Sequence, residues 1–409
     1  MISSTASVVV TGLGAVVGPT CGAAQLAQAM RSSSMRCMEV DRRDGYHLAD
    51  SARTAVLTSG LDLSPWVPPA AGRRMSPPSK LAVSAARMAV DEAGLAGDIG
   101  GPRTAVVMSG AFGAIQFTER LLRSAFLEGP EMVSPFTFTE SVANAAAAQI
   151  AIATQAMGSN LTIVQREAGI LTAVGRGAAE VAAGRAERAL VGGVEEMPPI
   201  LHALLDRFGA LARPESLGGE VARPFDRRRS GFVAAEGAVV LVLEHEGHAR
   251  SRGAKIRARV RGFTSAFDRS APRIGWGRGH VRLACALRAL IARAELEPRD
   301  IGRIVSGASG SVEGDRLEAF TLRAAWDDAR LPPILTPKGV TGEYGGGFLA
   351  SAVLAASERA PAHAAGFSEP DDELQIVPYC NGMLEPAAYT LVTSLASGGA
   401  ASWLLLEAA

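Results

Sequence analysis

The sequence predicts a mixed α/β fold built from two halves that repeat one another. The chain has 409 residues, 48% of them hydrophobic, which is enough to bury a core in two domain-sized units. Short runs rich in β-branched residues alternate with stretches of helical apolar spacing, and glycine-rich turns separate them. The order of helix, strand and glycine-rich turn recurs in the second part of the chain. We therefore place one half at residues 1–245 and the other at residues 246–409.

In the first half, the pattern indicates these elements in order: a buried strand and glycine turn at 7–15, a helix at about 22–30, an irregular segment at 31–77, a helix at 79–94, a strand at 103–109, a helix at 115–127, a loop from 134 to 144 and a helix at 145–157. Thr11-Gly-Leu-Gly14 lacks the third glycine and the downstream acid of a dinucleotide fingerprint, so we interpret it as structural. A strand near 239–244 closes the first half, and the second half opens with a strand near 254–263.

Residues 161–175 predict a strand that turns sharply into a helix, and Glu167 stands at the corner. A side chain there lies over the N-terminus of the new helix, where free N–H groups and the helix dipole stabilise negative charge. Enzymes use such a corner for a nucleophile, because the same field lowers a thiol pKa and can hold an oxyanion. A glutamate in this place is therefore informative.

Composition excludes several function classes. Lys plus Arg and Asp plus Glu number 41 each, which gives no electrostatic reason to expect a nucleic acid or an anionic membrane as partner. Neither a signal sequence nor an apolar run of membrane-spanning length is evident. The scattered cysteines indicate free thiols in a reducing cytosol. We expect a cytoplasmic protein with no metal and no cofactor, in which Cys380 is an ordinary thiol and the His245 and His248 side chains are solvated.

Residues 161–175, together with the helix and Gly-Gly-x-Glu strand at 184–196, resemble the nucleophile region of the β-ketoacyl synthases of the thiolase superfamily. The stretch 223–238 is similar to a second signature of that family, Pro-Phe-Asp-x-x-Arg-x-Gly-Phe-Val. The resemblance implies a five-layered αβαβα thiolase-like fold. Counting back from Ala-Val-Gly at 173–175 puts Glu167 at the position of the active-site cysteine.

The other catalytic positions of that family also differ here. Its first histidine motif is matched by residues 305–315, which puts Gly307 at the histidine, and its second by residues 338–346, which puts Glu343 at the other. Lys338 is retained, and we expect it to be a structural ion-pair partner. The glycine-rich gating loop of the family corresponds to Ala396, Ser397, Gly398 and Gly399.

A ketosynthase-like chain without Cys, His and His resembles the chain-length factor, or ketosynthase β subunit, of type II polyketide synthases. The resemblance implies a non-catalytic subunit that forms a heterodimer with a catalytic ketosynthase through the strand at 160–165. The pair would receive acyl groups from acyl carrier protein and enclose a tunnel that controls polyketide or polyene chain length. The tunnel residues that it implies in this chain are Phe112, Ile115, Thr118, Leu122, Phe136, Phe138 and Met197.

Two interpretations of Glu167 stay open. A buried carboxylate needs a partner or a raised pKa, so Glu167 could fill a vacated pocket and pair with Arg166 or Lys338. It could instead act as a general base in a malonyl-thioester decarboxylase or an unusual acyltransferase, with Glu343 assisting. Chain-length factors commonly carry Gln at this position, so Glu is a departure from their pattern. A homodimeric scaffold without catalytic function is a further alternative.

Overall fold

A computed structural model describes residues 7–34, 36–214, 219–362 and 364–409. One mixed sheet of eleven strands runs through the molecule in the order β11-β10-β14-β15-β9-β1-β8-β7-β5-β6, with β2 paired to β1. Its strands are β1 (Val8–Val17), β2 (Thr20–Cys21), β5 (Thr104–Ser109), β6 (Asn160–Ile163), β7 (Arg188–Glu195), β8 (Gly237–His245), β9 (Ala258–Phe267), β10 (Arg303–Val305), β11 (Ile334–Leu335), β14 (Tyr389–Leu395) and β15 (Ala400–Ala408).

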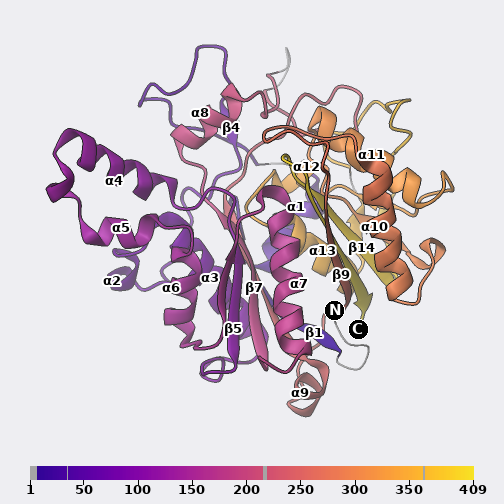
Figure 1. The fold of residues 1–409 in the computed structure, drawn as a ribbon, viewed down its shortest axis with the longest axis horizontal. Coiled ribbons are helices and arrows are strands. Elements are labelled where there is room, and N and C mark those ends of the chain that lie inside the picture. Colours follow the sequence, from indigo (N-terminus) through magenta and orange to yellow (C-terminus); the bar gives the residue numbers. More distant parts are fainter. Residues whose placement is uncertain (1–6, 35, 215–218, 363) are drawn as a thin grey trace.

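The sheet changes direction where β1 meets β9. Only Val8–Val10 of β1 pair with Ala258–Val260 of β9, whereas β1 and β8 pair along their whole length. From this short joint the two parts of the sheet diverge and enclose helices between them (Figure 1). The sheet therefore acts as two layers.

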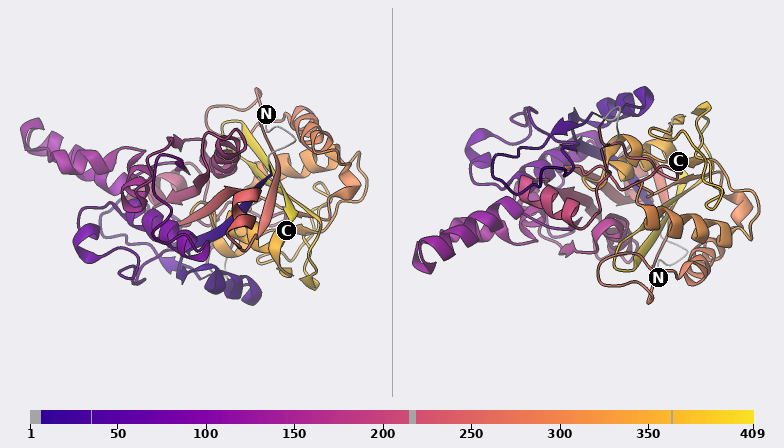
Figure 2. Two further views of the ribbon diagram at one scale, coloured as in Figure 1. Left: turned by 90° about the horizontal axis from the view of Figure 1, so that it is seen from below. Right: turned by 90° about the horizontal axis from the view of Figure 1, so that it is seen from above.

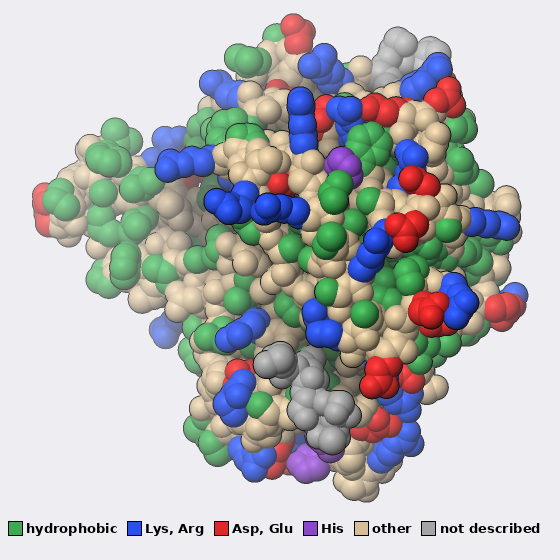
Figure 3. Space-filling view, turned by 45° about the vertical axis from the view of Figure 1, so that its right-hand side comes forward, with side chains coloured by type: hydrophobic (Ala, Val, Ile, Leu, Met, Phe, Trp, Pro, Cys, Tyr) green, Lys and Arg blue, Asp and Glu red, His purple; other side chains and the backbone are tan. Residues whose placement is uncertain are grey.

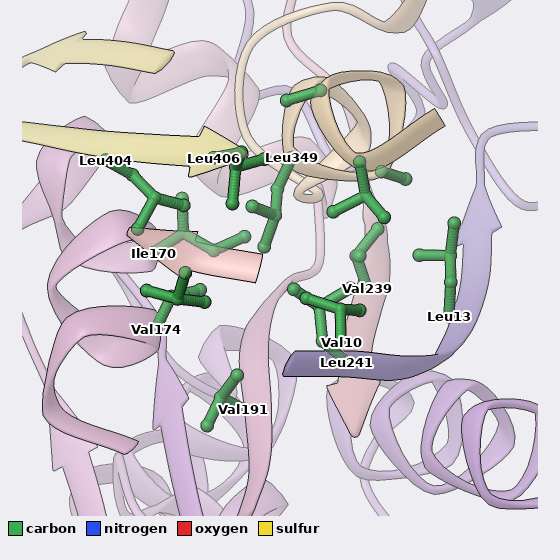
Figure 4. Close-up of a cluster of buried hydrophobic side chains, with 14 of the residues drawn as sticks. Val10, Leu13, Ile170, Val174, Val191, Val239, Leu241, Leu349, Leu404 and Leu406 are labelled. Atoms are coloured by element: carbon green, nitrogen blue, oxygen red, sulfur yellow. The ribbon is translucent and has the colours of Figure 1, made fainter. Parts of the chain in front are cut away.

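Helices α7 (Gly169–Ala182) and α13 (Gly347–Ser357) form the layer between the two parts of the sheet. Their apolar side chains meet those of β1, β7, β8 and β15 in one buried cluster, in which Ile170, Leu349 and Leu404 lie close together (Figure 4). Nearly every residue of α7 is buried, as expected for a helix covered on both sides.

Two outer layers complete the arrangement. Helix α3 (Pro77–Glu92) covers β1, β8 and β7, and α6 (Ala145–Thr154) covers β5 and β6. Helices α10 (His280–Arg293) and α11 (Val312–Ala325) cover the second part of the sheet. The layers follow the predicted order αβαβα. The contact of α3 with β1 is very close, because a Cβ on Gly12 would stand 2.0 Å from the Ala89 carbonyl oxygen. Gly12 thus serves packing within a continuous strand, and the predicted turn at Thr11–Gly14 is wrong.

Helices α4 (Ile115–Leu127) and α5 (Pro135–Ser141), with η1 (Pro130–Met132) between them, form an arm that projects from the body (Figures 1 and 2). The bounds of α4 are those predicted. The loop predicted at 134–144 is wrong in part, because Pro135 occupies the first turn of α5, where its fixed φ favours a helix.

The remaining elements are short or peripheral: α1 (Ala23–Ser32), β3 (Met38–Glu39), β4 (Thr54–Ala55), α2 (Pro69–Gly72), η2 (Arg166–Ala168), α8 (Pro199–Arg207), α9 (Glu246–Ser251), η3 (Pro298–Asp300), α12 (Lys338–Thr341), β12 (Ala360–Ala362) and β13 (Gly382–Leu384). Among the described residues, no helix combines the length and the apolar character that crossing a bilayer requires.

Candidate functional site

The predicted corner between strand and helix exists. Strand β6 leads into the single turn η2, and α7 begins at Gly169. Arg166 has a φ of +46°, a left-handed conformation that makes the sharp reversal. Gly169 lets α7 start against the end of β5, since a Cβ there would lie 2.2 Å from the Ser109 hydroxyl oxygen. Glu167 is therefore held at the junction of elbow and helix.

The Glu167 side chain is 7% exposed and accepts hydrogen bonds from two distant segments. The Tyr344 hydroxyl donates to its Oε1 at 3.0 Å, and the Ser397 backbone N–H donates to its Oε2 at 3.2 Å. Burial raises the pKa of Glu167 to about 7, and the nearby charge of Glu343 adds to the effect. Uncharged hydrogen-bond donors thus satisfy this carboxyl group.

The expected pairing of Glu167 with Arg166 or Lys338 is wrong. Arg166 Nη1 donates to the Ser397 hydroxyl oxygen at 2.6 Å and to its carbonyl oxygen at 3.2 Å. The Lys338 ammonium instead binds both carboxylate oxygens of Glu343, at 2.6 and 2.8 Å. It also stands 4.7 Å from the centre of the Phe348 ring. Lys338 is the ion-pair partner that we expected, but of a different carboxylate.

Gly307 has no space for a side chain. A Cβ at this position would approach the Thr393 carbonyl oxygen to 2.6 Å. The backbone N–H of Gly307 donates to the Thr393 hydroxyl oxygen at 3.2 Å, and that hydroxyl in turn donates to the buried carboxyl group of Glu318. The Ser306 hydroxyl donates to the same Glu318 oxygen at 2.5 Å, and burial raises the Glu318 pKa.

A small, partly open cavity of about 30 Å³ remains beside Glu167. Three carboxyl groups, those of Glu167, Glu195 and Glu343, contribute to its wall. Tyr344 also lines the cavity, and its ring contacts two further rings, with centroid distances of 5.1 Å to Phe112 and 5.7 Å to Phe232. A cavity of this size holds about one or two water molecules.

The predicted gate loop lies next to the elbow. It joins β14 to β15, and Gly398 and Gly399 have φ values of +89° and +100°, which favour glycine. The Gly399 N–H donates to the Ala396 carbonyl oxygen at 3.1 Å, and Gly398 N–H donates to Gly275 at 2.7 Å. Ser397 contacts both Glu167 and Arg166, so the loop is fastened to the elbow in this structure.

Comparison with known proteins identifies the family to which this geometry belongs. Residues 5–249 match the family model described as the N-terminal domain of beta-ketoacyl synthase. The chain belongs to the β-ketoacyl synthase family. A Streptomyces halstedii protein described as polyketide beta-ketoacyl synthase 2 is 33% identical over 277 residues, which are 67% of this chain and 65% of that protein. The 3-oxoacyl-(acyl-carrier-protein) synthase 2 of Vibrio cholerae is 26% identical, with 98% of both chains aligned. The chain thus spans slightly less than two thirds of the Streptomyces relative.

Solved structures agree with this assignment. The ishigamide ketosynthase/chain length factor superposes with a TM-score of 0.89 at 25% identity, over 99% of both chains. The complex AntDE:AntF, a type II polyketide synthase ketosynthase with its acyl carrier protein, gives a TM-score of 0.87 at 22% identity over 99% of both chains. These likenesses confirm the thiolase-like fold, and the first links the chain to a ketosynthase/chain-length-factor structure.

The structure disperses the residues that the family resemblance implies for the tunnel. Phe112 and Ile115 pack against a buried cluster that contains Met197, below α8. Thr118 donates its hydroxyl to the Ala114 carbonyl oxygen at 2.9 Å. Leu122, Phe136 and Phe138 are 47%, 41% and 56% exposed on the arm. Neither the cavity beside Glu167 nor a smaller one of about 20 Å³ behind Gly113 is lined by any of these seven predicted residues.

Sequence reasoning missed Tyr344, Glu195 and Glu318. Glu195 ends β7, accepts a hydrogen bond from the Ala111 N–H at 2.7 Å, and has a pKa raised to about 8 by burial. Its place in the Gly-Gly-x-Glu strand was a usable signal. Tyr344 could have been noticed as a bulky residue among glycines. In the described residues, no group of three or more His, Cys, Asp or Glu side chains could hold a metal ion.

Proposed function

We propose that this chain is a non-catalytic subunit of the chain-length-factor type, which pairs with a catalytic β-ketoacyl synthase and shapes the tunnel that sets chain length. The observation that carries the proposal is the state of the elbow. A condensing ketosynthase needs a thiolate nucleophile with a base nearby. The elbow here presents Glu167, which accepts hydrogen bonds from the Tyr344 hydroxyl and the Ser397 backbone N–H. The charge of the neighbouring Lys338 is neutralised by Glu343.

A partner surface of suitable character lies on one side of the molecule. Strand β6 stands at the end of the strand order, and within the described part of the chain it pairs only with β5, which leaves its other edge without a strand partner there. The neighbouring arm carries large apolar side chains that project into solvent: Leu122, Phe126, Leu127, Met132, Phe136 and Phe138. Figure 3 shows hydrophobic side chains, in green, gathered on the projecting lobe. Large exposed apolar patches next to an open strand edge favour association.

The relatives support the same assignment by analogy. The ishigamide structure is a ketosynthase/chain length factor, and the AntDE:AntF structure contains an acyl carrier protein. On this basis, the partner of the chain is a catalytic ketosynthase, and acyl groups reach the pair as acyl carrier protein thioesters. The resulting protein is a heterodimer in the cytoplasm.

The decarboxylase alternative has one point in its favour and one against it. With a pKa of about 7, Glu167 could exchange a proton near neutral pH. The adjoining cavity, however, has a volume of about 30 Å³, which in this conformation is room for one or two water molecules and not for a malonyl thioester. We therefore keep the non-catalytic subunit as the proposed function.

Co-expression with a ketosynthase that has an intact Cys-His-His set tests the proposal. Mass measurement of the purified assembly should give one copy of each chain. The double substitution Phe126→Glu and Leu127→Glu places two charges on the arm, at side chains that are 81% and 77% exposed, and should abolish the heterodimer. Val377→Glu, at a 60% exposed apolar position outside the arm, is the matched control and should leave the complex intact. A homodimer that excludes the ketosynthase would contradict the proposal.

A further inference from the structure

Tyr344 occupies a backbone position that suits glycine. Its φ is +76°, and Gly342, Gly345 and Gly346 around it have φ values of +72°, +64° and +77°. A bulky L residue rarely adopts this conformation, because its Cβ crowds the backbone. Such strain persists only where the surroundings hold the residue in place.

Contacts on three sides hold Tyr344. Its ring meets Phe112 and Phe232 edge-on, with interplanar angles of 71° and 84°. Its hydroxyl donates to Glu167 at 3.0 Å, and its backbone N–H donates to Glu343 Oε1 at 3.1 Å. The contacts to the ring and the hydroxyl come from segments far apart in the sequence, whereas the backbone contact is to the preceding residue.

The ring also limits the space at the elbow. Tyr344 lines the cavity of about 30 Å³, which therefore ends where the ring begins. If the Tyr344 phenol were removed, the volume that it occupies would be added to this cavity. The enlarged space would have aromatic walls formed by Phe112 and Phe232, and an acceptor, the Glu167 carboxyl group, at one end.

We propose that Tyr344 is a built-in plug, whose phenol fills a latent binding cavity at the elbow, and that this cavity takes a small uncharged phenol once the side chain is removed. The aromatic walls select a planar ring, and the Glu167 acceptor selects a hydroxyl group on it. An anionic ligand is disfavoured, because the buried charge would find no free cation among the described residues of the elbow: Lys338 is bound to Glu343, and Arg166 is bound to Ser397. The inference goes beyond the proposed function, because it rests on the geometry of this chain alone.

The substitution Tyr344→Gly tests the plug. Glycine suits the positive φ, so the variant keeps the backbone while it loses the ring. p-Cresol has the shape of the missing side chain. Calorimetric titration should show one p-cresol site per chain, at least ten-fold tighter than the site for toluene, which lacks the hydroxyl group. Saturating p-cresol should also raise the Tm of the variant, since a ligand that binds only the folded state stabilises it.

The wild-type chain and Tyr344→Phe, which keeps the ring in place, should bind neither compound. Tyr379→Gly removes a tyrosine outside the elbow and is the matched control. 4-Hydroxybenzoate should not bind Tyr344→Gly. A folded Tyr344→Gly chain with no p-cresol site, or p-cresol binding to the wild type at equal affinity, would overturn the proposal. If Tyr344→Gly does not fold, the p-cresol titration and the Tm measurement are made on Tyr344→Ser instead. A Tm that saturating p-cresol does not raise in that variant would refute the plug.

Discussion

Glu167→Gln should change how the stability of the chain depends on pH. The folded-state pKa of Glu167 is about 7, against an ordinary value of 4.5. In the window between these values the folded chain retains the proton that the unfolded chain has released, so raising the pH favours unfolding. The shift corresponds to about 3 kcal/mol, at 1.36 kcal/mol for each pKa unit. This destabilisation is absent below pH 4.5 and fully present above pH 7.

Glutamine removes the titration and can keep the contacts. Its amide oxygen can accept from the Ser397 N–H, and its NH₂ group can donate to the Tyr344 hydroxyl oxygen, which then acts as acceptor. The stability of Glu167→Gln relative to wild type should therefore rise by about 3 kcal/mol between pH 4.5 and pH 8. Urea denaturation followed by tryptophan fluorescence at several pH values measures this difference. Parallel wild-type and variant profiles would refute the reasoning, and Glu128→Gln, at an exposed carboxyl on the arm, controls for the loss of one charge.

Three further substitutions test the site. Lys338→Met leaves the buried Glu343 carboxylate unpaired and should lower the free energy of unfolding, measured by urea denaturation, by about 3–5 kcal/mol. The double variant Lys338→Met with Glu343→Gln should recover most of that stability. Equal losses in the two variants would contradict the ion pair. Gly307→Ala should cost about 1–3 kcal/mol because a Cβ does not fit, and a thermal scan with an unchanged Tm would show that the backbone yields. Arg166→Ala removes the two hydrogen bonds from the guanidinium group to Ser397, so hydrogen exchange at the Ser397 amide should become faster. An unchanged exchange rate would show that Glu167 alone holds the loop.

Local patterns in the sequence were sufficient for the elements that position the site. The bounds of α4 and the elbow before α7 follow from apolar spacing within a single segment. Motif counting placed Glu167 and the loop at Ser397 in one site. The hydrogen bond from the Ser397 N–H to the Glu167 carboxyl group confirms that they lie side by side. The short helix α5 was missed because Ser-Pro and a cluster of hydroxyl residues are also typical of a loop.

The partners of each site residue were beyond prediction. Glu167 and Tyr344 are separated by 177 positions, and no periodicity links them. Lys338 has three buried carboxyl groups nearby, those of Glu167, Glu318 and Glu343, and only the packed structure shows that it binds the last. The tunnel residues were inferred from a family in which two chains enclose the space. A single chain shows only part of such a wall, so those assignments stay predictions.

One elongation assay decides whether this chain takes part in the chemistry of the heterodimer. The heterodimer is prepared in three forms: unsubstituted, with Glu167→Ala in this chain, and with the nucleophilic cysteine of the partner ketosynthase replaced by alanine. Acyl carrier protein loaded with malonyl groups is the substrate, and mass spectrometry follows decarboxylation and chain growth. If this chain is a non-catalytic subunit, Glu167→Ala retains both activities, while loss of the partner cysteine abolishes chain growth. Loss of decarboxylation or initiation in an intact Glu167→Ala complex would contradict that assignment and make Glu167 a participant in the chemistry.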